Sequence, residues 1–267
     1  MRRRIKHRLV TAGAGLAMVA AAGTAAAEDC AAPVLAADFE ADSGLARALA
    51  AHPLLSIEEA PDGGHALKAR YVGNAHGSER IVVRYPLGVT GTDFTLVYDV
   101  WLAPDFQFVL GGKMHGLGPA QPVTGGDPLR PDGWSSRVMW REGGAPVTYV
   151  YHQHQPGKFG EDGAAVSEAT FTPGESQRVA IHIALNTEEG RPGSSRVYLD
   201  GELVNRLEDV TYRSVFAEET DISQLLFSTF FGGNAPEWAP KDTGGDYVTV
   251  TARYDNIAVY PGLCTGM

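Results

Sequence analysis

Five residues of types that bind carboxylates or transfer protons lie close together in the middle of the chain. They are Lys113, Ser135, Arg137, Tyr149 and Tyr151. A cation beside a carboxylate stabilises the negative charge that develops when a neighbouring proton leaves. Tyrosine serves as a general acid or base once its pKa is shifted by its surroundings. Hydrolysis of a glycoside would instead need two acidic residues at a defined separation, which these segments lack.

The chemistry that this set favours is β-elimination on a uronic acid. The enzyme removes the C5 proton, alpha to the carboxylate, and expels the glycosidic oxygen from C4. We expect Arg137, helped by Lys113, to neutralise the carboxylate, and Tyr149 or Tyr151 to act as base or acid. Ser135 would orient the sugar or a tyrosine. The sequence does not rank the two tyrosines, and a desolvated Lys113 is an alternative base.

Strand periodicity places these residues on one surface. In WSSRVMWR the odd positions, including Ser135 and Arg137, share one face of a predicted strand. A hairpin back through VTYVY sets Tyr149 and Tyr151 beside them, because cross-strand neighbours lie about 5 Å apart. Lys113 follows two glycines after FQFVL, which reads as a strand, so we expect its side chain to overhang the same surface from the strand end.

The rest of the chain predicts an all-β protein. Alternating apolar and polar residues occur in ALKARYV, RIVVRY, DFTLVYDVWLAP, RVAIHIAL, SRVYLDGELVN, QLLFSTFFGG and YVTVTARYDNIAVY. Asp200-Gly201 between two such runs indicates a tight hairpin. One short helix is expected within 36–52. The pattern is typical of a single-domain β-jelly roll, a concanavalin A-like sandwich of antiparallel sheets.

Four segments together resemble polysaccharide lyase family 14, the alginate and glucuronan lyases with a β-jelly-roll fold. They are FQFVLGGKMHGL, GWSSRVMWR, TYVYHQHQPGKFGED and LLFSTFFGGNAPEWAP, and the similarity extends from about Asp93 to Tyr260. The resemblance implies a lyase that needs no cofactor, with an active site that matches the five residues named above, position by position.

The chain departs from the family pattern after the lysine, where Met114-His115 replaces Leu-Pro and a long turn follows. His115 is therefore a candidate substrate contact, with a loop histidine without a role as the alternative. Arg141 is a second candidate. Trp134 is a third, through stacking on a sugar ring, although packing in the core is the ordinary role of such a residue.

The N-terminus has the features of a secretory signal. A basic front precedes an apolar run from Leu9 to Ala22 and small residues at 25–27. We expect residues 1–27 to be a cleaved signal peptide, 28–267 to be the lyase domain, and the product to be secreted or periplasmic. In an oxidising compartment the two cysteines, Cys30 and Cys264, would form a disulfide between the two ends of the domain.

Charge limits the class of partner. The chain has a net charge of −10, and the 27 residues of the expected signal hold five of the 22 basic residues and none of the 32 acidic ones. Seventeen basic against 32 acidic residues leave −15, which disfavours nucleic acid and anionic membranes. Residues 107–160 have a net charge of the opposite sign, with five basic and three acidic residues. We expect a monomer that binds an anionic polysaccharide, with a non-catalytic carbohydrate-binding module as the alternative.

Overall fold

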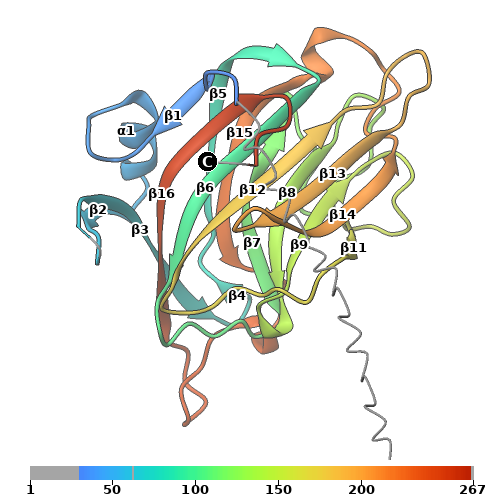
Figure 1. Ribbon diagram of the computed structural model, residues 1–267. Helices are drawn as coiled ribbons and strands as arrows, with labels where there is room; N and C mark the ends of the chain where they lie inside the picture. The colour runs from blue at the N-terminus through green and yellow to red at the C-terminus, as the bar shows by residue number, and fades with distance from the viewer. Residues whose placement is uncertain (1–29, 62, 266–267) are drawn as a thin grey trace, which may run out of the picture.

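Two antiparallel β-sheets packed face to face make up the protein (Figure 1). The computed structural model describes residues 30–61 and 63–265, so the expected signal peptide at 1–27 lies outside the described residues. In chain order the elements are β1 (Leu35–Ala37), α1 (Gly44–Ala50), β2 (Leu55–Glu59), β3 (His65–Asn74), β4 (Gly77–Ser78), β5 (Ile81–Gly91), β6 (Asp93–Leu102), β7 (Gly111–Gly118), β8 (Ser135–Arg141), η1 (Glu142–Gly144), β9 (Pro146–Tyr151), β10 (Glu161–Asp162), β11 (Ala164–Ala165), β12 (Ser176–Ala184), β13 (Gly193–Leu199), β14 (Glu202–Val210), η2 (Glu218–Thr220), β15 (Ile222–Phe231), η3 (Pro236–Trp238) and β16 (Thr249–Pro261).

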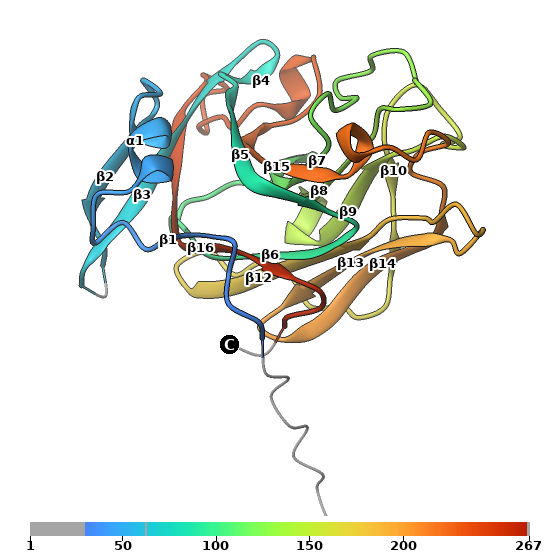
Figure 2. The ribbon, with the colours of Figure 1, turned by 90° about the horizontal axis from the view of Figure 1, so that it is seen from above.

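The two sheets differ in size. The larger has ten strands in the order β11-β14-β13-β12-β6-β16-β3-β2, with β1 paired to β16 and β4 to β3. The smaller has six, in the order β10-β9-β8-β7-β15-β5. Figure 2 shows the two layers edge-on, with loops gathered over the side of the smaller sheet that faces away from the larger one. We call that side the outer face of the six-stranded sheet.

The core between the sheets is apolar and rich in aromatic rings. Tyr71, Phe106, Trp140 and Phe231 pack edge to face or stacked, with ring centres 5.3–6.1 Å apart. One pair of polar groups joins the two layers through this core: the Ser136 hydroxyl lies 2.8 Å from that of Ser195. This pairing removes the cost of burying them.

The alternating runs named in the sequence analysis form strands as predicted, and the hairpin is confirmed. At the hairpin, Asp200 and Gly201 both have positive φ, 50° and 83°, as a tight turn between twisted strands requires. The predicted helix is confirmed in shorter form as α1, where the hydroxyl of Ser43 accepts a hydrogen bond from the Ala46 amide.

One strand was placed wrongly. FQFVL is not a strand; it forms a turn, and the strand β7 begins at Gly111. Gly111 has a φ of 130°, and a Cβ there would lie 2.5 Å from the carbonyl oxygen of Trp140. Only glycine allows so close an approach of the two strands. Lys113 therefore lies within the sheet, paired with Met139, and does not overhang it from a strand end.

The predicted disulfide is confirmed. Cys30 and Cys264 are bonded, with their Cα atoms 5.3 Å apart. The bond closes a loop of 234 residues, and a native disulfide of this kind contributes about 2–5 kcal/mol to stability. It ties the first described residue to the segment after β16, the central strand of the larger sheet. No helix among the described residues is long and apolar enough to cross a membrane.

Candidate active site

Strand register brings the predicted site residues together on the outer face of the six-stranded sheet. Ser135 pairs with Tyr151 and Arg137 with Tyr149, as the strand periodicity predicted. On the other side of β8, Lys113 pairs with Met139 and Gly116 with Arg137. Side chains of Lys113, Arg137 and Tyr149 therefore project from three neighbouring strands into one region.

Arg137 is a buried cation without an acidic partner. Its side chain is 6% exposed, its Nε has no hydrogen-bond partner, and no carboxylate pairs with it in the described part of the chain. Burial lowers the pKa of Arg137 to about 10, with the neighbouring Arg84 adding to the effect. The guanidinium stays charged at neutral pH, so it is a buried positive charge left open for an anion.

Lys113 is held among cations and apolar groups. Its Nζ lies 3.7 Å from the centre of the Tyr149 ring and 3.3 Å from the Sδ of Met139. Burial lowers the pKa of Lys113 well below its ordinary value, and the guanidinium groups of Arg137 and Arg141 lower it further. The attraction of the ring for the ammonium works in the opposite direction, by about 1 kcal/mol. A lysine in this setting is available as a neutral base.

Both tyrosine hydroxyls accept a hydrogen bond from the backbone of a loop. The amide of Gly160 donates to Tyr149 at 3.1 Å, and the amide of Gly126 donates to Tyr151 at 2.9 Å. Burial raises the pKa of Tyr149 above its ordinary value, and the neighbouring Tyr151 raises it further. The nearby guanidinium of Arg141 lowers this pKa by a smaller amount, so the net shift is upward: Tyr149 keeps its proton and can donate it.

Ser135 holds a loop. Its hydroxyl donates to the carbonyl oxygen of Val123 at 2.7 Å, and the serine is fully buried. Val123 packs with Met139, Tyr149 and Tyr151 in a small apolar cluster. The 119–134 loop, which joins β7 to β8, is thus fastened over the β8–β9 end of the site by Ser135 and Tyr151.

Two predicted substrate contacts lie in the core. His115 is fully buried and stacks on Phe227 with ring centres 3.9 Å apart. A β-bulge between Lys113 and Gly116 shifts the register and sends the Met114 and His115 side chains into the interior. Trp134 is also fully buried, and its Nε1 donates to the carbonyl oxygen of Thr220 at 2.8 Å. Neither ring is accessible to a sugar, so both expectations are corrected.

Arg141, the third predicted contact, lies at the end of β8 and faces the site. Its guanidinium makes two hydrogen bonds with Asp162 of β10, at 2.7 and 2.5 Å. The carboxylate neutralises Arg141, which leaves Arg137 as the stronger attraction for an anion. His152 is likewise paired, with its Nε2 2.8 Å from Glu161.

Two cations of the outer face were missed by the sequence reasoning. Arg80 directly precedes β5 and Arg84 lies within it, in the segment RIVVRY that was read only as a strand. Arg84 is paired through Leu226 of β15 with Gly116 of β7, so it lies on the row that carries Arg137. The signal was available: in RIVVRY both arginines have the parity that faces away from the apolar core.

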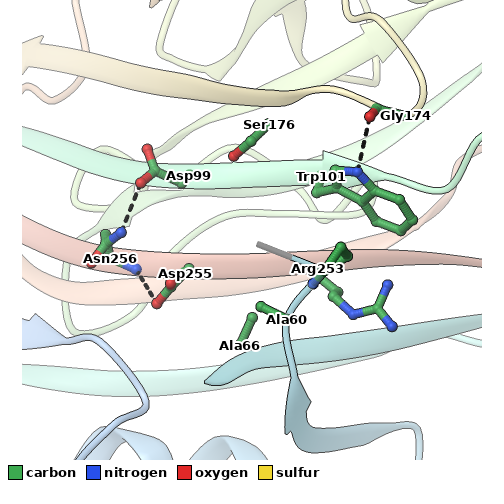
Figure 3. A pocket seen from close by; sticks show the side chains of 10 residues that line it. Ala60, Ala66, Asp99, Trp101, Gly174, Ser176, Arg253, Asp255 and Asn256 are labelled. Atoms are coloured by element: carbon green, nitrogen blue, oxygen red, sulfur yellow. Dashed lines mark hydrogen bonds between the residues drawn. The ribbon is translucent and has the colours of Figure 1, made fainter. Parts of the chain in front are cut away.

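A separate hollow on the other sheet is chemically different. It has a volume of about 290 Å³. Figure 3 shows it on the larger sheet, between Trp101, Arg253 and the carboxylates of Asp99 and Asp255. Asn256 bridges the two acids, donating to Asp99 at 2.8 Å and to Asp255 at 2.7 Å. Two adjacent carboxylates disfavour a polyanion, so the open cations of the six-stranded sheet make the better site.

A protein-family model matches more than half of the chain. The family model for polysaccharide lyase 14 matches residues 81–249. The chain belongs to this family. It is a polysaccharide lyase, and the resemblance inferred from its motifs is confirmed. The matched range includes every strand of the six-stranded sheet. No curated protein matches the chain.

Solved structures of other lyases share the fold of this polysaccharide lyase. A mutant of the alginate lyase Aly36B in complex with an alginate trisaccharide is 25% identical, over 73% of this chain and 81% of that one, with a TM-score of 0.61. The alginate lyase of Aplysia kurodai is 18% identical, over 86% and 100%, with a TM-score of 0.67. An endo-β-1,4-glucuronan lyase from the fungus Trichoderma reesei is 18% identical, over 79% and 89%, with a TM-score of 0.52.

Proposed function

We propose that this polysaccharide lyase cleaves a uronic acid polymer, alginate or glucuronan, by β-elimination, and leaves a C4=C5 double bond in its product. The observation that carries the proposal is the buried, unpaired guanidinium of Arg137 beside a lysine whose pKa is lowered. A carboxylate of the substrate would supply the missing partner of Arg137. The neutral amine of Lys113 would then meet a carbon acid whose proton is acidified by that pairing.

The reaction begins with removal of the C5 proton by the Nζ of Lys113. The electron pair of the broken C5–H bond moves into the carboxylate, where the charge of Arg137 stabilises it. As it returns to form the C4=C5 bond, the bond from C4 to the glycosidic oxygen breaks. Tyr149 donates its phenolic proton to that oxygen. A proton passed from the Lys113 ammonium to the Tyr149 phenolate, directly or through water, restores both groups.

Tyr149 is favoured over Tyr151 as the acid because of its position. The ring of Tyr149 lies directly beneath the Lys113 ammonium, and its hydroxyl accepts a hydrogen bond from the Gly160 amide. Tyr151 is completely buried, and its hydroxyl fastens the 119–134 loop at Gly126. We therefore assign Tyr151 and Ser135 to positioning.

Export of the protein is part of the proposal. The disulfide between Cys30 and Cys264 supports an oxidising compartment, and the sequence of residues 1–27 has the features of a signal peptide. A polymer too large to enter a cell would then be met outside the cytoplasm.

Product analysis tests the proposed function. Purified protein without residues 1–27 would be incubated with polymannuronate, polyguluronate and glucuronan, with neutral polysaccharides as controls. We expect ultraviolet absorbance from the new double bond on at least one polyuronate, and products of matching mass. Folded protein that yields no absorbance on the whole panel would refute the proposal, and binding without product would indicate a carbohydrate-binding module instead. Saturated reducing sugars would indicate a hydrolase.

A further inference from the structure

A row of side chains crosses the outer face of the six-stranded sheet from the site to the edge strand. The strand registers align Tyr149, Arg137, Gly116, Leu226 and Arg84 in that order across β9, β8, β7, β15 and β5. Arg84 and Arg137 are three strands apart, roughly 14 Å between their Cα atoms at the usual strand spacing. The row therefore has a cation at the site and a second cation at the edge.

Between the two cations the face of the sheet carries little side-chain bulk. Gly116 has no side chain, and a Cβ there would lie 2.0 Å from the carbonyl oxygen of Ser136 and 2.5 Å from the Cα of Arg137. The position next to Arg137 is thus kept free of side-chain atoms by close packing of the strands. Beyond it the side chain that precedes Arg84 on this row is that of Leu226, which lies deep in the face and is 2% exposed.

The edge cations have no acidic partner. Arg84 is exposed, and no carboxylate pairs with it in the described part of the chain. Arg80, one position before β5, is exposed too and lies over the ring of Phe230 at 5.6 Å. Both act on the site through space: Arg84 lowers the pKa of Arg137, and Arg80 that of Lys113.

At the opposite edge of the sheet, where β10 lies, the charged side chains of that strand are paired. There β10 contributes two carboxylates, Glu161 and Asp162, and the Gly160 and Gly126 amides sit on the tyrosine hydroxyls. A polyanion that extended in this direction would meet loop backbone and carboxylates that are already paired with Arg141 and His152. In the direction of β5 it would meet exposed arginines.

We infer that Arg84, supported by Arg80, forms a distal subsite that binds the carboxylate of a sugar several residues away from the one held by Arg137, so that the polymer lies across the strands from the site to the β5 edge. The inference rests on the proposed polyuronate substrate. Each sugar of such a chain carries one carboxylate, so a single extended chain can satisfy both cations at once. An exposed ion pair contributes about 0.2–1 kcal/mol, which corresponds to roughly a 1.4-fold to fivefold change in affinity.

Chain length is the variable that tests this subsite. The variants Arg84→Gln and Arg84→Lys would be compared with Arg70→Gln, which removes an exposed arginine from β3 of the other sheet. The assays are kcat/KM by ultraviolet absorbance on long polymer and on the shortest oligosaccharide that is cleaved, together with polymer binding by affinity electrophoresis. We expect Arg84→Gln to lose up to about fivefold in kcat/KM and in binding on polymer, through KM and more steeply at low salt, and to lose much less on the short substrate.

Rescue by Arg84→Lys and no effect of Arg70→Gln would complete the expected result. An equal loss on short and long substrates, or no loss on polymer, would overturn the subsite. Failure of the proposed function gives a different result, because wild-type protein would then form no unsaturated product. In that case polymer binding decides. The subsite is also overturned if the wild type binds no polyuronate, or if Arg84→Gln binds it as well as the wild type does.

Discussion

The ammonium of Lys113 lies 3.7 Å from the centre of the Tyr149 ring, and burial moves the pKa values of these two neighbours in opposite directions from their ordinary values. The lysine loses its proton more readily and the tyrosine holds its proton more firmly. At neutral pH the pair therefore consists of a stronger candidate base and a protonated acid. Opposed shifts of this kind identify which group accepts a proton and which one donates it.

The first prediction concerns Lys113. Arginine keeps the positive charge but cannot become neutral near pH 7, so Lys113→Arg should lower kcat by about 10²-fold or more. In the wild type, activity should rise with pH as Lys113 loses its proton, and this limb of the profile should lie well below pH 10.5. Measurement of kcat against pH by ultraviolet absorbance checks both points. Lys68→Arg, on the other sheet, is the matched control. Full activity of Lys113→Arg would show that Lys113 serves only as a charge.

The second prediction separates the two tyrosines. Tyr149→Phe removes the proposed acid and should lower kcat by about 10²-fold with little change in KM. Tyr151→Phe removes the hydroxyl that accepts from the Gly126 amide, so it should lower stability by about 1 kcal/mol and act mainly on KM. Steady-state kinetics and urea unfolding of both variants provide the readout. The reverse pattern would transfer the role of acid to Tyr151.

The third prediction concerns acid stability. Burial lowers the pKa of His115 to about 3, from 6.5, and neither ring nitrogen has a hydrogen-bond partner of good geometry. The folded state keeps this histidine neutral, so its contribution to stability is complete above pH 6.5 and is lost as the pH falls towards 3. Between pH 6.5 and 4.5 the loss is about 2 kcal/mol.

His115→Phe should remove this part of the pH dependence, because phenylalanine has a similar shape and does not titrate. Urea unfolding of wild type and variant between pH 4.5 and 8 measures the difference. His154→Phe, an exposed histidine of the loop after β9, is the control. Parallel curves for wild type and His115→Phe would contradict the prediction.

The fourth prediction concerns the hollow of the larger sheet. Burial raises the pKa of Asp255 to about 6, and the neighbouring Asp99 raises it further. The protonated acid is favoured by folding, so the contribution of Asp255 to stability is present below its ordinary pKa and is lost as the pH rises through 6. Asp255→Asn should therefore stabilise the protein by about 1 kcal/mol at pH 8, after allowance for solvent screening, and by almost nothing at pH 4. Thermal unfolding at the two pH values is the check, and equal gains at both would contradict it.

The sequence by itself determined the sandwich and the makeup of the site. Alternation in β8 and β9 places Ser135, Arg137, Tyr149 and Tyr151 on one face, because the side-chain period of a strand is two, and the hairpin between them fixes which residues are neighbours. The cysteine pairing was equally accessible, since only two cysteines are present.

Tertiary structure alone decided burial, and with it the roles of the residues. A bulge in β7 turns His115 into the core, and Trp134 is enclosed by Tyr212 and Thr220, although both residues had polar or loop-like surroundings in the sequence. The alignment of Arg84 with Arg137 depends on three strand registers between segments far apart in the chain. The pKa values of Lys113 and Tyr149 depend on desolvation in the folded protein, where the loops that follow β7 and β9 lie against the site. Periodicity records which way a side chain points, but not what covers it.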